Sequence, residues 1–174
     1  MKVSLFFTVP KDEKIVTKLI KFFQGLNASH CSIIFPSDYG KRLVYESKGL
    51  GEGLISFNNM MIDNYVIDEF EIILPEGFEI KSLFNHIYER IGYHYSYGQL
   101  IGYGWCLVVK KIFNKDVSNP FKNGERSTTC HEACLIALRD VFKFTELNGL
   151  TFDNLDLKWF YEFCIKNEKL IRKT

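Results

Sequence analysis

Two short β-prone runs, SHCSIIF and RLVYES, flank the turn-rich segment PSDYGK. Proline, serine, aspartate and glycine between two such runs are typical of a β-hairpin, so the sequence predicts an antiparallel pair of strands. If the turn is centred near Asp38 and Tyr39, facing residues have numbers that sum to about 76 or 77. This register puts His30 beside Glu46 or Ser47 on one face of the hairpin.

Other runs of the chain predict the remaining strands and helices. Val66, Phe70, Ile72 and Leu74 alternate with polar residues, as in a strand that buries one face. Most of the expected strands precede the helices, so we expect an α+β fold in which a small antiparallel sheet packs against helices. Strands are expected at residues 3–9, at the LISF run after a GLGEG loop, and at 66–74; helices are expected at 11–25, 79–92, 128–142 and 155–166.

Composition limits the class of protein. The chain has 174 residues, of which 47% are hydrophobic, so residues 1–174 are expected to form one globular domain with a substantial core. Its 22 basic residues nearly balance its 21 acidic ones, and no run of lysine or arginine is long enough to bind a phosphate backbone. Nucleic acid is therefore not an expected partner.

The cysteines and the apolar runs of the sequence indicate in which cellular compartment the protein is expected. The five cysteines include no CxxC pair, which indicates neither a disulfide framework nor a zinc ribbon and favours a reducing compartment. The apolar start MKVSLFFTVP is too short for a signal peptide, and the run at 101–109 is too short for a transmembrane segment. We therefore expect a cytoplasmic protein, and no pattern indicates an oligomeric state.

Cys130 lies in the run STTCHEACLIAL, where it falls in the first turn of a helix that Ser127, Thr128 or Thr129 can cap. Free backbone N–H groups and the helix dipole at such an end stabilise a thiolate. The same N–H groups can donate to an oxyanion formed on an attacked carbonyl. Cys130 is therefore the candidate nucleophile, and the other four cysteines are interpreted as core or incidental thiols.

A nucleophilic thiol benefits from a neighbouring base, and the base needs a partner on its other ring nitrogen. The hairpin supplies His30 as the candidate base and Glu46 as the candidate acceptor, since facing residues of an antiparallel pair share one face. His131 directly follows the nucleophile and is expected to point away from it. The sequence thus predicts a Cys, His, Glu site.

These motifs resemble those of a known family. SHCSI, LVYES, GYHYSYGQLIG and TTCHEA occur in the same order as the motifs of the circularly permuted NlpC-type members of the papain-like superfamily, which are related to the lecithin retinol acyltransferase-like enzymes. The resemblance spans residues 30–138 and implies that Tyr95 lies near the thiol, with Tyr93 and Tyr97 as rivals. One departure is His131, which stands where the family often has serine.

The resemblance implies a cysteine hydrolase that needs no cofactor and cleaves an amide, peptide or isopeptide bond, such as one in bacterial cell-wall peptide. A lipid acyl ester is the next substrate class. The rival function is a noncatalytic module that binds a peptide or lipid on the same fold. A zinc site is disfavoured, because the residue four after His131 is Leu135 rather than the second histidine of HExxH.

Overall fold

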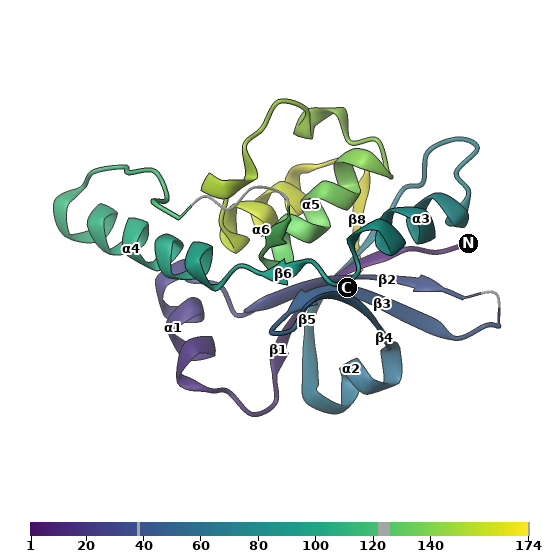
Figure 1. Cartoon of the computed structure of the whole chain (residues 1–174), viewed down its shortest axis with the longest axis horizontal. Coiled ribbons are helices and arrows are strands. Elements are labelled where there is room, and N and C mark those ends of the chain that lie inside the picture. Colours follow the sequence, from purple (N-terminus) through teal and green to yellow (C-terminus); the bar gives the residue numbers. More distant parts are fainter. Residues whose placement is uncertain (38, 122–125, 174) are drawn as a thin grey trace.

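The computed structural model describes residues 1–37, 39–121 and 126–173. Its fold class is α+β, as expected: a six-stranded antiparallel sheet packs against helices (Figure 1). The strand order is β4-β3-β2-β1-β5-β8, and a separate pair joins β6 to β7. The strands are β1 (Ser4–Pro10), β2 (His30–Pro36), β3 (Arg42–Lys48), β4 (Gly51–Ser56), β5 (Asn64–Ile72), β6 (His94–Tyr95), β7 (Ser127–Thr128) and β8 (Leu170–Lys173).

Helices cover both faces of the sheet. In Figure 1, α5 and α6 lie on one side of it and α2 on the other, while α1 and α4 pack together at one end of the molecule. Two short 3-10 turns, Thr145–Leu147 and Phe152–Asn154, connect α5 to α6. The helices are α1 (Ile15–Gln24), α2 (Phe57–Asp63), α3 (Ile80–Arg90), α4 (Tyr97–Phe113), α5 (Cys130–Asp140) and α6 (Leu157–Lys166).

Side chains of the central strands β1 and β2 point alternately to the two faces of the sheet, and each face has its own hydrophobic core. Phe7 on β1 and Ile33 on β2 are fully buried and face the main core beneath α5. Phe6 and Ile34, one residue along, face a smaller core with Met60 of α2. Because successive side chains of a strand point to opposite faces, these two strands hold α5 on one side of the sheet and α2 on the other.

The register predicted for the hairpin is wrong by one or two residues. Ile33 pairs with Tyr45 and Pro36 with Arg42, so facing numbers sum to 78. Asp38, at the expected centre of the turn, lies outside the described residues. On this register His30 and Glu46 are diagonal neighbours on the same face, and a diagonal pair is still within reach of long side chains.

Two further expectations need correction. The GLGEG segment is not all loop, because β4 begins at Gly51 and pairs with β3. Val66 does not share a face with Phe70 and Ile72: the pairing of β1 with β5 shifts between Phe7 and Thr8, and Val66 packs in the smaller core. A β-bulge moves every side chain beyond it to the opposite face.

The sequence patterns did not predict α2, α4 or β8. Helix α4 contains three glycines, which disfavour a helix, but Gly102 leaves room for Asn119 to approach the helix closely. In the part of the chain that the structure describes, no helix combines the length and apolar character needed to span a membrane. Asn119, Pro120, Asn123 and Gly124 disfavour any regular element, so the sequence also predicts a long loop from about Lys115 to Thr129. The structure has the short strand β7 in this segment, and residues 122–125 lie outside the described residues.

Candidate active site

Cys130 is the first residue of α5, and a capping box fixes the start of this helix. Thr129 is the N-cap, and its backbone N–H donates to Glu132 Oε2 over 2.8 Å. In the first turn of a helix the backbone N–H groups of Cys130 and His131 have no acceptor inside the helix. These two donors and the positive end of the helix dipole are therefore close to the Cys130 sulfur.

His30, the first residue of β2, lies beside Glu46 of β3. The His30 Nε2 atom is 2.8 Å from Glu46 Oε2, and both side chains are buried. Burial disfavours the imidazolium, but the Cys130 thiolate and the Glu46 carboxylate outweigh it and raise the pKa of His30 to about 10. Because Nε2 is used by Glu46, Nδ1 is the nitrogen left for Cys130.

The Cys130 thiol is only 5% exposed, yet its pKa is held well below its usual value. A hydrogen bond from Cys31 contributes most to this shift, burial opposes it, and the charge on His30 and hydrogen bonds from His131 and His30 add to it. The carboxylate of Glu46 also has a lowered pKa, because its hydrogen bond and charge interaction with His30 outweigh its burial. The directions of all three shifts favour a thiolate, an imidazolium and a carboxylate at this site.

His131 does not point away from the nucleophile, so that expectation is wrong. Its Nε2 atom is 2.6 Å from the carbonyl oxygen of Leu155, its Nδ1 atom is 3.1 Å from Thr129 Oγ1, and its side chain is near enough to Cys130 for each to shift the pKa of the other. Burial lowers the pKa of His131, but Cys130 and Glu132 outweigh it and the net direction is upward. His131 is therefore a second imidazole beside the thiol whose protonated form the site favours.

Cys31 is a second residue whose part in the site was missed. It was interpreted as a core thiol, and it is fully buried, but it also lies against both cysteines of α5. Its sulfur donates a hydrogen bond to that of Cys134 over 3.8 Å, and Cys31 and Cys130 shift each other's pKa in opposite directions. Burial and these neighbours raise the pKa of Cys31 well above its usual value, so Cys31 keeps its proton.

Tyr95 lies close to the nucleophile through strand pairing. Strand β6 pairs in parallel with β7, which sets Tyr95 against Thr128, two residues before Cys130. Burial and the charge of Cys130 raise the pKa of Tyr95 well above its usual value, so its hydroxyl keeps its proton. Its rival Tyr97 packs against it edge-on, with ring centroids 5.0 Å apart, and is more exposed.

A buried ion pair holds the segment that leads into Cys130. Arg90 of α3 donates two hydrogen bonds, of 2.9 and 2.7 Å, to Glu52 of β4. Glu52 also accepts from Thr128 Oγ1 over 2.6 Å, and Ser47 donates to the Thr128 carbonyl over 3.0 Å. Strands β3 and β4 thus fix the backbone just before α5. No sequence motif pointed to this cluster, because its members come from four separate segments.

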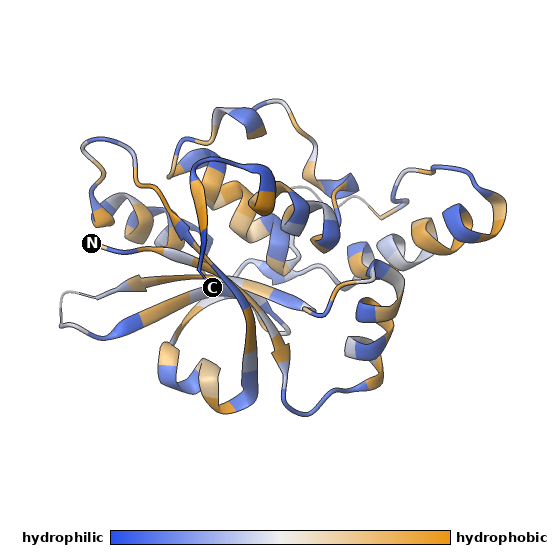
Figure 2. Cartoon of the chain, turned by 180° about the vertical axis from the view of Figure 1, so that it is seen from behind, coloured by the Kyte–Doolittle hydropathy of each residue, from blue (hydrophilic) through white to orange (hydrophobic). Residues whose placement is uncertain are grey.

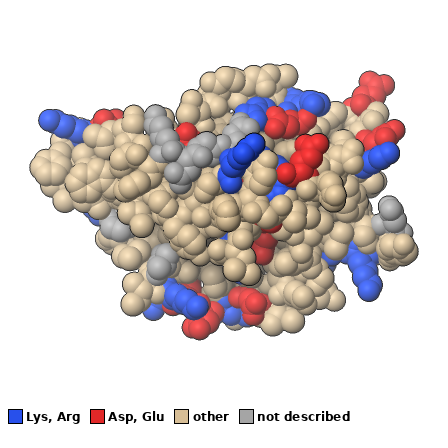
Figure 3. All heavy atoms as spheres, in the orientation of Figure 1, with Lys and Arg blue, Asp and Glu red and all other residues tan. Residues whose placement is uncertain are grey.

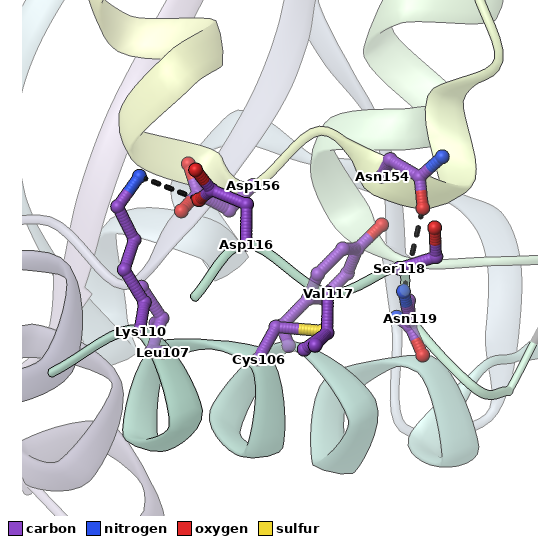
Figure 4. Close-up of a pocket in the computed structure, with 10 residues that line it drawn as sticks. Cys106, Leu107, Lys110, Asp116, Val117, Ser118, Asn119, Asn154 and Asp156 are labelled. Carbon is purple, nitrogen blue, oxygen red and sulfur yellow. Dashed lines mark hydrogen bonds and ion pairs between the residues drawn. The ribbon is translucent and has the colours of Figure 1, made fainter. Parts of the chain in front are cut away.

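A cavity of about 420 Å³ lies on one side of α4 and is not lined by Cys130 or His30. In Figure 4 some of its polar groups pair with each other: Lys110 bonds Asp116 over 2.8 Å, and the Asn119 backbone N–H donates to Asn154 Oδ1 over 3.4 Å.

Among the described residues, no group of three or more His, Cys, Asp or Glu side chains is placed to bind a metal ion.

No protein-family model matches the chain, and no curated protein matches it. The candidate site therefore depends on the sequence motifs and on its own geometry. The structure brings together Cys130, His30 and Glu46, with Tyr95 close by, and adds His131 and Cys31 to the set. A signal for His131 was present, since a histidine inside the first turn of a capped helix contacts residues around the N-cap.

Proposed function

We propose that this protein is a cysteine hydrolase that cleaves an amide, peptide or isopeptide bond through a thioester acyl-enzyme. The observation that supports it most is the 2.8 Å hydrogen bond between Glu46 and His30, together with the mutual effect of His30 and Cys130, which raises the pKa of the histidine and lowers that of the thiol at the capped start of α5. The motif order adds to this support, because it resembles that of permuted NlpC-type enzymes. The fold would then be a permuted papain-like one, with the base and its acceptor before the nucleophile.

In the first half of the reaction, the Cys130 thiolate attacks the substrate carbonyl carbon and a C–S bond forms. The negative charge moves to the carbonyl oxygen, where the Cys130 and His131 backbone N–H groups and the Tyr95 hydroxyl are candidate donors. When the C–N bond breaks, the His30 imidazolium gives its Nδ1 proton to the leaving amine. A thioester on Cys130 and a neutral His30 remain.

In the second half, His30 takes a proton from water as the water oxygen attacks the thioester carbon. Collapse of this second tetrahedral intermediate breaks the C–S bond, releases the carboxylic acid and restores the thiolate. Glu46 stays ionised and keeps the His30 ring oriented through the 2.8 Å hydrogen bond. An alcohol in place of the amine gives the same sequence for a lipid acyl ester, the second substrate class.

The test uses p-nitrophenyl acetate, an activated ester that reports on the nucleophile without assuming the natural substrate. Wild-type protein should release a burst of about one equivalent of p-nitrophenolate and carry an acetyl group on Cys130 by mass spectrometry. Cys130→Ser should lose both signals, while the matched variant Cys106→Ser keeps them. A burst that survives in Cys130→Ser, or no burst in wild type, contradicts the proposal and favours the noncatalytic binding module.

A further inference from the structure

Helix α1 turns an apolar stripe outward. Ile15 is 77% exposed, Leu19 48% and Phe22 66%. Their spacing of four and three residues puts them on one side of the helix, where a globular protein ordinarily buries its apolar face. This stripe is what made the sequence predict an ordinary amphipathic helix at residues 11–25. In the structure these three side chains keep about half or more of their surface exposed.

Helix α4 repeats this arrangement over a longer span. Ile101 is 66% exposed, Trp105 56% and Ile112 66%, and their spacing of four and seven residues again defines one side of the helix. Phe113, at the end of the helix, is 64% exposed. In Figure 2 hydrophobic residues recur along this helix, which stands out from the body of the molecule. Figure 3 shows few charged atoms over the same end of one face.

The two helices form one surface, which we call the α1/α4 surface and define by Ile15, Leu19, Phe22, Ile101, Trp105, Ile112 and Phe113. They pack against each other, and an apolar cavity of about 250 Å³ between them is lined by Leu19 and Ile101. Lys111 lies over the Phe22 ring, with its Nζ atom 4.8 Å from the centroid. The two stripes therefore belong to a continuous patch.

Lysines are the charged residues inside the two helices: Lys18 and Lys21 of α1, and Lys110 and Lys111 of α4. Carboxylates just outside the helices pair with two of them, Glu13 with Lys21 over 2.7 Å and Asp116 with Lys110 over 2.8 Å, so Lys18 and Lys111 are the two that these ion pairs do not involve. A lysine beside an exposed apolar stripe can extend its ammonium to lipid phosphates while its methylenes cover apolar surface. Apolar side chains, an exposed tryptophan and a set of lysines are the features of helices that lie in a membrane interface.

We propose that the α1/α4 surface docks on an anionic lipid bilayer, with the apolar stripes in the interface and the lysines at the headgroups. Charge favours this occupant over a second copy of the chain, because a two-fold pairing of this face would bring Lys18 and Lys111 close to the same lysines of the other copy. Each lysine near an anionic surface strengthens binding by about fivefold. Binding of this surface to a bilayer requires no reaction at Cys130, so the docking proposal is independent of the proposed function.

Docking would bring the candidate active site close to the bilayer. Helix α1 ends at Gln24, six residues before His30, and α4 begins at Tyr97, two residues after Tyr95. The His30 end of β2 and the Tyr95 strand are therefore tied by short connections to the docked helices. The protein would act on substrates that lie at, or are attached to, a membrane surface; this step rests on the proposed function.

Vesicle flotation of the full chain tests the docking. We expect binding to vesicles of phosphatidylcholine with about one-third phosphatidylserine, and at least about tenfold weaker binding to phosphatidylcholine alone. Lys18→Gln/Lys111→Gln should weaken binding to the anionic vesicles by about 25-fold. Ile101→Glu should weaken it by at least about tenfold, whereas Ile165→Glu, the same change at an exposed isoleucine of α6, should leave it unchanged.

Tryptophan fluorescence tests whether α4 is the part of the protein that contacts the bilayer. The chain has two tryptophans, and Trp159→Phe leaves Trp105 as the only one while keeping an aromatic ring against Phe163. Anionic vesicles should shift the emission of this variant to shorter wavelength as Trp105 enters the interface.

Absence of flotation, flotation unchanged by Ile101→Glu, or a concentration-dependent dimer that Ile101→Glu dissolves would overturn the proposal. Cys130→Ser should bind vesicles as wild type does, so failure of the docking and failure of the hydrolase proposal are told apart.

Discussion

Two buried carboxylates on neighbouring strands differ in the cation that each one meets. Glu46 of β3 bonds His30, and Glu52 of β4 bonds Arg90 through two hydrogen bonds. An arginine stays charged at every accessible pH, so the Glu52–Arg90 pair can only hold structure. A histidine gains and loses a proton, so the Glu46–His30 pair can take part in chemistry. We call the Glu52–Arg90 pair the clamp, because it holds structure only, and the Glu46–His30 pair the reactive pair.

The largest expected effect is on the clamp. Arg90→Met leaves the Glu52 carboxylate buried without its cation and should lower the free energy of unfolding by about 3–5 kcal/mol, measured by urea denaturation. The matched variant Glu52→Gln/Arg90→Met removes both charges and should recover part of the loss. A loss below about 1 kcal/mol in Arg90→Met would mean that the pair does not hold this part of the fold.

The next effect is on the reactive pair. His30→Gln keeps a donor for Glu46 but cannot carry a charge, so the pKa of Cys130 should rise. At about pH 7 the rate of Cys130 alkylation by iodoacetamide should fall about 30-fold or more. His86→Gln, at a partly buried histidine of α3, is the control and should leave the rate unchanged. An unchanged rate in His30→Gln would remove His30 from the site.

A smaller effect is expected at the carboxylate. Glu46→Gln keeps a hydrogen bond to His30 but removes the charge that stabilises the imidazolium, so Cys130 alkylation near neutral pH should fall about tenfold. Glu52→Gln makes the same chemical change on the neighbouring strand. It should lower the urea midpoint yet leave the alkylation rate of the folded protein within about twofold. Equal effects of the two substitutions on the rate would erase the distinction between clamp and reactive pair.

The smallest effect is a pH dependence of stability from the His30 and Cys130 charges. The folded pKa of His30 is raised from 6.5 to about 10, so its stabilisation is present below 6.5 and is lost as pH rises through about 10. The folded pKa of Cys130 is lowered from 9.0, so its stabilisation is present above 9.0 and is lost as pH falls through the folded pKa.

Between these two unfolded values, about pH 6.5 to 9, the folded and unfolded forms of the pair bind the same number of protons. The free energy of unfolding of wild type, minus that of Cys130→Ser/His30→Gln, should therefore be flat in this window and decline on both sides. Urea unfolding at a series of pH values measures this difference. A steady slope across the window would contradict the ion pair.

The sequence predicted the fold where pattern and turn chemistry act locally. The hairpin, the first strand and a helix with Cys130 in its first turn were all expected, because alternation, turn residues and helix-capping residues are local signals. Helix α4 was missed, because its glycines oppose a helix and its stability depends on packing against α1 and on the close approach of Asn119. The shifted face of Val66 depends on a bulge, which has no local signal here.

The candidate site was predicted in part for the same reason. His30 and Glu46 could be paired from the hairpin, and the error in register was tolerated because a diagonal neighbour is also within reach. His131 was misjudged because its place beside Cys130 depends on tertiary packing around the start of α5. Cys31 is the core thiol that was expected, but its effect on Cys130 depends on how α5 meets β2 and was not foreseen. The clamp of Glu52 and Arg90 is tertiary for the same reason.

The central claim is that Cys130 is a thiolate in the resting protein because of its partners rather than its exposure. The most direct test follows the iodoacetamide alkylation of Cys130 and Cys106 against pH in one sample by mass spectrometry. Cys106 is more exposed, but burial raises the pKa of its thiol.

We expect Cys130 to react rapidly with a rate that is level through neutral pH, while the rate of Cys106 is low and still rises above pH 9, the usual value of a free thiol. A Cys130 rate that rises only at alkaline pH, in parallel with that of Cys106, would contradict the claim.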